Sequence, residues 1–166
     1  MLVQGVSDKA LATLDPNKLT PRNDHEKERI ARMSAVQDEL GELILERLKR
    51  LPTQVRIPLE DGSELLLVHG SPADPAEAIT FDMSDEEVSA LIGDDPADVI
   101  VCGMSHVPFD RMIGDIRVIN VGSVGEAPTA GGGRVAHATW IESRPSGLVV
   151  EQIAVPLDAA EERLGL

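Results

Sequence analysis

The longest periodic pattern in the chain lies in its first third. Apolar residues recur at every third or fourth position from Ile30 to Leu48, and Asn23 or Asp24 stands where a helix N-cap would be expected. This spacing predicts one amphipathic helix that runs to about Arg50 and covers another element with its apolar side.

Beyond residue 52 the apolar segments are short and turn residues separate them. We predict three hairpins from these segments. The first is formed by TQVRIPL and ELLLVHG around an Asp-Gly turn, the second by RMIGDIRVIN, and the third by VAHATWIE and LVVEQIAV. ELLLVHG and DVIVC are apolar on both faces, which is typical of strands inside a covered sheet. Ser84 caps a short helix that ends at Gly93. The pattern also predicts a strand end at residues 1–5, a loop over 121–133 and a terminal helix or tail over 159–166, so the fold class is α/β.

Length and charge narrow the possible functions. A chain of 166 residues favours a single domain. No apolar run is long enough for a membrane span and the start lacks the features of a signal peptide, so we expect a cytoplasmic protein without membrane contacts. The formal net charge of −14 argues against nucleic-acid binding. An anionic substrate would need a local positive charge such as a metal ion.

Two histidines follow the two most apolar strands. His69 comes after LLLV, and His106 comes four residues after Cys102. Because ligands gather outside the carboxyl ends of parallel strands, both imidazoles could face one crevice and bind a metal; the alternative is that both are structural. We expect His25 to be solvated and His137 to be structural. The single Cys102 cannot form an intrachain disulfide or a thiolate zinc site, and we interpret it as a small buried hydrophobe.

The order of the motifs resembles a known family. LLLVHGSP followed by VIVCGMSHVPFDRMIGDIRVINVGSVG resembles the C-terminal half of the calcineurin-like metallophosphoesterases, in particular the small prokaryotic type, where the pattern reads LxxxHG, CGHTHxPF, a hairpin and NPGSVG. VQGVSDKAL is similar to the family's VxGNxD segment. The resemblance implies that residues 1–166 are a single domain, the C-terminal two thirds of a four-layer α/β/β/α sandwich with mixed sheets that is truncated at the N-terminus.

The resemblance also implies a chemistry. Two divalent metals, which are manganese, iron or zinc, clamp a phosphate monoester or diester and activate a bridging water. By family role, His69 would hold one metal, His106 would hold the other, and Asp8 would be the acidic catalytic residue that orients its neighbours. The substrate would be a small phosphorylated molecule. Backbone contacts from the NPGSVG-like loop would shape the pocket wall, through Asn120, Gly122 and Ser123.

Several departures from the family pattern bear on activity. Val6 stands where the family has a metal-binding asparagine, Ser7 where many members have a histidine that assists the leaving group, and Met104 where the first histidine of CGHTH would bind metal. The DxH and GDxxD carboxylates have no counterpart. Two imidazoles alone cannot hold two divalent cations. We therefore expect a metallophosphoesterase by descent that is inactive in this chain, or a non-catalytic binding or regulatory module on the same fold.

Three explanations of the missing start remain open: a shortened reading frame, a degenerate member kept for binding, and an enzyme completed by a partner. Val6 and Met104 lie inside the sequence, so truncation alone does not account for the lost ligands. Loss of the first strands would also leave LLLVHG or VIVCG as an unpaired sheet edge, which a homodimer could cover.

Overall fold

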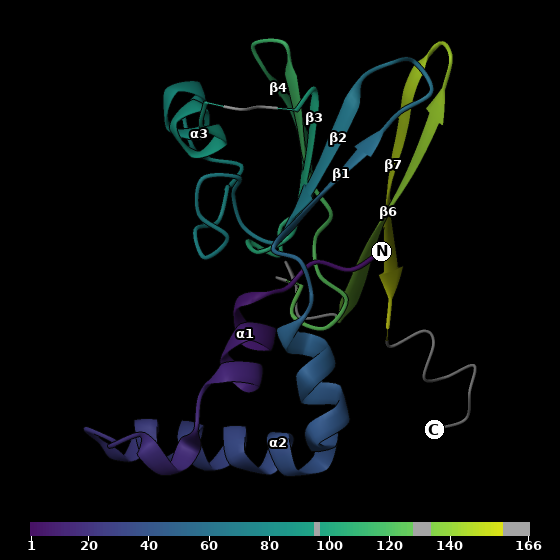
Figure 1. The fold of residues 1–166 in the computed structure, drawn as a ribbon. Coiled ribbons are helices and arrows are strands. Elements are labelled where there is room, and N and C mark those ends of the chain that lie inside the picture. Colours follow the sequence, from purple (N-terminus) through teal and green to yellow (C-terminus); the bar gives the residue numbers. More distant parts are fainter. Residues whose placement is uncertain (95–96, 128–133, 158–166) are drawn as a thin grey trace. The chain divides into compact units, whose positions relative to one another are not determined.

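The computed structural model describes residues 1–94, 97–127 and 134–157, which form two compact units, Met1–Thr53 and Gln54–Leu166 (Figure 1). The interpretation of the whole chain as one domain stays a prediction. No helix in the described ranges has the length and the apolar character that crossing a bilayer requires.

The first unit is helical. It contains α1 (Val6–Thr13), a short 3₁₀ helix η1 (Pro16–Lys18) and α2 (Asp24–Lys49). The predicted long helix is confirmed together with its cap, since the Asn23 side chain accepts a hydrogen bond of 2.8 Å from the Glu26 amide. Figure 1 also shows a sharp bend in α2, which occurs at Gly41, where φ is 72° and ψ is 164°.

The prediction of a strand end at residues 1–5 was wrong. These residues are not in a strand, and Gly5 is the N-cap of α1, where its amide donates to the Asp8 carboxylate at 2.8 Å. The apolar run is instead attached to the end of α2. Gln4 donates through its backbone amide to the Pro52 carbonyl and through its side chain to the Leu48 carbonyl, both at 2.8 Å. A short apolar run forms a strand only when it can hydrogen-bond to a neighbouring strand. Here the hydrogen bonds of Gln4 to the end of α2 are made in place of such strand pairing.

The second unit is built on a mixed five-stranded sheet of order β1-β2-β3-β5-β4. Its strands are β1 (Gln54–Pro58), β2 (Glu64–Val68), β3 (Val99–Cys102), β4 (Phe109–Ile113) and β5 (Ile116–Asn120). Strands β2, β3 and β5 are parallel, while β1 and β4 pair antiparallel to their hairpin partners. The first two predicted hairpins and the α/β class are confirmed.

The predicted position of the sheet edge was wrong. Either LLLVHG or VIVCG was expected to present an unpaired edge, yet β2 lies between β1 and β3, and β3 lies between β2 and β5. The edges of the sheet are β1 and β4, because each hairpin adds its own antiparallel strand outside the parallel set.

Two apolar layers cover the two faces of this sheet. On one face, α3 (Asp85–Ile92) packs Val88 and Ile92 against a cluster that includes Ile100 and Cys102. On the other face, the hairpin of β6 (Val135–Arg144) and β7 (Gly147–Pro156) packs against Val99 and Val101. Successive residues of β3 thus point to opposite cores, which explains why this strand is apolar throughout.

The second unit therefore shows three layers, α/β/β, of the expected four-layer sandwich, within residues 54–94, 97–127 and 134–157. The third predicted hairpin is confirmed. Residues 121–127 have no regular structure, as expected for a loop. The rest of the predicted loop, 128–133, and the terminal helix or tail over 159–166 lie outside the described residues.

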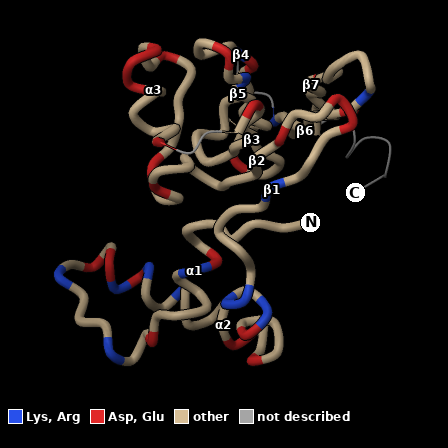
Figure 2. Tube along the Cα trace, turned by 45° about the horizontal axis from the view of Figure 1, so that its top comes forward, with Lys and Arg blue, Asp and Glu red and all other residues tan. Residues whose placement is uncertain are grey.

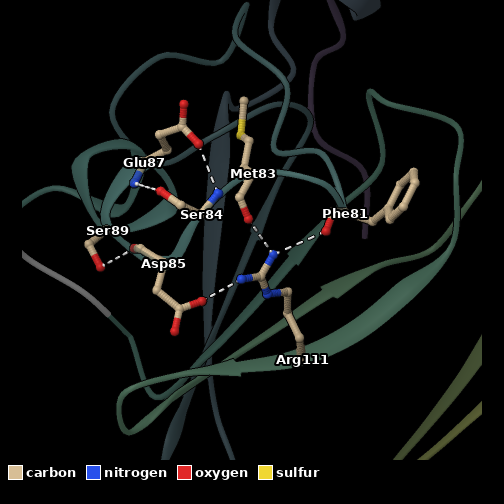
Figure 3. A network of polar contacts seen from close by, with 7 residues as sticks. All are labelled: Phe81, Met83, Ser84, Asp85, Glu87, Ser89 and Arg111. Carbon is tan, nitrogen blue, oxygen red and sulfur yellow. Dashed lines mark hydrogen bonds and ion pairs between the residues drawn. The ribbon is translucent and has the colours of Figure 1, made fainter.

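A polar network joins the start of α3 to the edge strand β4 (Figure 3). The Ser84 hydroxyl accepts from the Glu87 amide at 3.2 Å, and the Glu87 carboxylate accepts from the Ser84 amide at 2.8 Å, so the predicted cap is a full capping box. From β4, Arg111 donates to the carbonyls of Phe81 at 3.2 Å and Met83 at 2.8 Å, and it pairs with Asp85. One guanidinium thus holds the entry of α3 against the sheet.

Arg111→Ala should lower the free energy of unfolding by about 1–2 kcal/mol, because two carbonyls and one carboxylate lose a shared donor. Urea unfolding followed by circular dichroism measures this change. Arg144→Ala is the matched control, since Arg144 pairs with Glu142 in a solvent-exposed position, and it should lower the free energy of unfolding clearly less than Arg111→Ala does. Equal losses in both variants would contradict a special role for Arg111.

Gly70 makes the tightest backbone approach near the end of β2. A Cβ atom at this position would lie 2.6 Å from the carbonyl oxygens of both Pro75 and Glu77. Backbone atoms cannot move aside as a flexible side chain can, so the loop that follows β2 requires glycine here.

Gly70→Ala should therefore destabilise the protein by about 2 kcal/mol or more through overpacking against backbone. Gly125→Ala is the control, because a Cβ there would meet no heavy atom within 4 Å, and we expect a change within about 0.5 kcal/mol. Thermal unfolding of both variants measures the difference. A Gly70→Ala protein as stable as the parent would show that the loop has room to shift.

Candidate functional site

The candidate site lies at the carboxyl ends of the three parallel strands. Strand β2 ends before His69, β3 ends before the turn that carries His106, and β5 ends at Asn120. The His69 carbonyl accepts hydrogen bonds from the amides of Gly103 at 3.1 Å and Met104 at 2.9 Å. The segments that carry the two predicted histidines are thus adjacent, as the sequence predicted from the rule for open sheets.

His106 has an unusual backbone conformation. Its φ is 61°, and among the described residues no other non-glycine residue has a positive φ. The turn is closed by the His106 amide, which donates to the Gly103 carbonyl at 3.0 Å. In this conformation the imidazole Nδ1 lies 3.6 Å from a carboxylate oxygen of Glu126. The left-handed region is costly for most residues, although histidine tolerates it better than branched residues do.

Asn120 connects the histidine turn to the loop after β5. The residue is fully buried; its Nδ2 donates to the Ser105 hydroxyl at 2.9 Å, and its Oδ1 accepts from the Gly122 amide at 2.9 Å. Gln152 on β7 donates to the Asn120 carbonyl at 3.1 Å. The predicted pocket-wall residues Asn120, Gly122 and Ser123 therefore lie at this end of the sheet, and the side chain of Asn120 is the main link.

Cys102 lies directly beneath this link, and Asn120 Nδ2 is 3.6 Å from its Sγ. Burial raises the pKa of the Cys102 thiol to about 12. The group thus stays protonated at neutral pH, whereas a thiolate is needed for metal binding or nucleophilic attack. This agrees with the interpretation of Cys102 as a small buried hydrophobe.

His137 is a site residue that the sequence did not connect to the others. It lies on β6, its amide donates to the Ser123 carbonyl at 2.8 Å, and a Cβ at Gly122, whose φ is 75°, would lie 2.6 Å from the His137 Cβ. Its buried Nδ1 has no hydrogen-bond partner in the described part of the chain. No motif relates positions 122 and 137, although the alternation along the strand did indicate a residue with a structural role.

Asp8, the third predicted site residue, lies in the helical unit. Its carboxylate accepts the Gly5 amide and so caps α1, next to Val6 and Ser7 at the helix start. Its proposed role as the acidic residue that orients its neighbours stays a prediction.

The donors near His69 and His106 do not fit a two-metal centre. Within the described ranges, no group of three or more His, Cys, Asp and Glu side chains is arranged to hold a metal ion. Glu126 is the carboxylate found beside His106, and the 3.6 Å between its oxygen and the imidazole Nδ1 is longer than a hydrogen bond. Each zinc or manganese ion of a catalytic pair needs about three or four protein ligands, and carboxylates to offset its charge.

Two solved structures share this fold. A hypothetical protein from Pyrococcus horikoshii OT3 is 22% identical with a TM-score of 0.69, and 98% of the present chain matches 66% of that chain. A metallophosphoesterase from Sphaerobacter thermophilus is 19% identical with a TM-score of 0.62, and the match covers 99% of the present chain and 71% of that one. The chain thus spans about two thirds of the length of these structures.

A weaker similarity, with a TM-score of 0.42 and 18% identity over 64% of this chain and 62% of the other, is to Vps29 from Entamoeba histolytica complexed with Zn²⁺. No curated protein matches the sequence. The family model of the calcineurin-like phosphoesterase superfamily domain matches residues 3–141, which is most of the chain. The chain therefore belongs to the calcineurin-like phosphoesterase superfamily.

Proposed function

We propose that this chain, by itself, is a non-catalytic binding module on the phosphoesterase fold. Members of the superfamily bind divalent metals and use them for phosphoester hydrolysis. The observation that carries the proposal is the donor set: His69 and His106 are retained, yet the described residues supply no third imidazole, thiolate or carboxylate to complete a metal site around either one.

The charge distribution supports the same proposal. Residues 1–53 contain nine basic and nine acidic side chains, whereas residues 54–166 contain six basic and twenty acidic ones, so the sheet unit carries the whole net charge of −14. Figure 2 shows acidic residues on α3, while most basic residues lie in the helical unit. Without bound cations, this field repels a phosphoester dianion from the sheet unit. Hydrolysis therefore depends on metals that the chain is poorly equipped to hold.

The scaffold around the site is nevertheless intact. Asn120 holds the turn and the loop together through hydrogen bonds that need no metal. The Ser105 hydroxyl accepts from Asn120 and so keeps its own hydrogen to donate to a ligand. We propose that this edge binds a small polar molecule without net negative charge through such donors, in a cytoplasmic protein. The acidic field of the sheet unit leaves nucleic acids and anionic membranes as unsuitable partners.

In an assay with bis-p-nitrophenyl phosphate and Mn²⁺, the purified chain should give no hydrolysis above the metal-only blank, because two activated metals are needed to generate and position the attacking hydroxide. His106→Ala should leave this background unchanged. Turnover that His106→Ala abolishes would contradict the proposal. His25→Ala is the matched control, since His25 is exposed on α2, and an activity that both variants retain would come from a contaminant.

The metal content of the same preparation gives an independent measurement. After dialysis against micromolar Mn²⁺ or Zn²⁺, elemental analysis should find well below two metal ions per chain, because few ligands surround each histidine. Two ions per chain that are lost in His69→Ala and His106→Ala would show a complete centre and would refute the proposed function.

A further inference from the structure

We propose that the chain forms a symmetric homodimer through the outer edge of β7. This inference stands apart from the proposed function, because it rests on the β6–β7 hairpin and on none of the site residues. The hairpin is a separate two-stranded sheet of ten residues per strand (Figure 1). Long strands with open edges are templates for pairing with another strand.

The hydrogen-bond pattern shows which backbone groups of β7 point outward. Leu157 donates to the Arg134 carbonyl, so the odd-numbered residues of β7 bond to β6, and the register places Ile153 opposite Ala138. In an antiparallel pair the intervening residues direct both backbone groups away from the partner. The amide and carbonyl groups of Val150, Gln152 and Ala154 therefore lie on the outer edge.

Among the described residues no backbone group pairs with this stretch of edge, and the residues on either side mark where it ends. At its N-terminal end, the Leu148 carbonyl already accepts a hydrogen bond from Arg117 at 3.3 Å. At its C-terminal end, Pro156 has no amide hydrogen to donate. The outer edge of β6 differs, because the His137 amide on that side donates to Ser123. Residues 148–156 contain no lysine or arginine and no internal proline, which are the residues that usually protect an edge.

One register of self-pairing satisfies both hydrogen bonding and charge. If Gln152 lies opposite Gln152 of a second copy, Val150 lies opposite Ala154 on either side, and three such pairs give about six backbone hydrogen bonds. Glu151 then faces Ile153 of the other copy, so the one charged residue of the strand avoids its equivalent. A register shifted by two residues would set Glu151 against Glu151 and is disfavoured.

The same register extends an apolar surface. The face of the hairpin that points away from the main sheet exposes Trp140 by 60%, Ile153 by 39% and Val155 by 46%. Pairing two β7 strands joins two such faces into one four-stranded sheet and covers part of Ile153 and Val155. A second copy is the occupant that this geometry favours, because the strand is complementary to itself about a twofold axis.

Sedimentation equilibrium of the full chain should show a reversible increase from 17.8 kDa toward twice that mass as the concentration rises. Added salt should strengthen the association, because it screens the repulsion between two chains that each carry −14. A chain that stays monomeric at every concentration and salt level would overturn the proposal, and so would association that salt weakens.

Charge variants test the register. Ile153→Glu places a second acid opposite Glu151 of the other copy at two symmetric positions, so the dimer dissociation constant should rise by about tenfold or more. Adding Glu151→Lys to Ile153→Glu should recover most of that loss. Ala138→Glu is the matched control, since it adds the same charge to the same face on β6, away from the edge, and should leave association nearly unchanged. A double variant as weak as Ile153→Glu would overturn this register.

Discussion

The parallel pairing of β2, β3 and β5 determines where every candidate residue of the sheet unit lies. Val68, Cys102 and Asn120 end these strands at one edge, and the residues that follow are forced into neighbouring loops. The pairing in turn depends on two apolar cores, because each parallel strand buries side chains on both faces. The site geometry is thus a consequence of burial, and it does not require a bound metal.

This separation explains how the fold could persist in a chain that, as we propose, lacks the catalytic donors. The bonds that hold the site loops together come from backbone atoms and from the buried amide of Asn120. None of these bonds involves the side chain of Met104. The side chain at position 104 can therefore change at little cost to stability, whereas replacement of Asn120 would leave buried polar groups without partners.

Local signals predicted the elements best. The turn at Asp61–Gly62, the cap at Ser84 and the period of the long helix each depend on a few adjacent residues, and each was confirmed. The errors concern partners that are distant in sequence. Residues 1–5 have the composition of a strand, but Gln4 finds its hydrogen bonds at Leu48 and Pro52. The prediction of the sheet edge was wrong because it left out the hairpin strands β1 and β4. The sequence did predict these strands, and each of them pairs outside the parallel set.

The residues of the candidate site also differ in how well the sequence predicted them, again according to whether the signal is local. The motifs brought out His69, His106 and the loop from Asn120 to Ser123, because the residues are grouped at strand ends. His137 was assigned only a structural role, since its close approach to Gly122 joins strand β6 to the loop after β5 and leaves no signature at either position. The bend at Gly41 likewise falls inside an unbroken helical period, which the sequence pattern cannot distinguish from a straight helix.

The conformation of His106 is the feature that most resembles a catalytic adaptation, because backbone strain is often retained at functional sites. Here the surrounding hydrogen bonds account for it. The His69 carbonyl fixes Gly103 and Met104, the Gly103 carbonyl accepts the His106 amide, and Asn120 holds Ser105 in between. With both flanks fixed in this way, the turn places residue 106 in the left-handed region whatever its side chain does. The backbone strain at His106 is thus explained by how the strands are joined. Whether the site can be active depends instead on the number of metal-ligand donors around the imidazole.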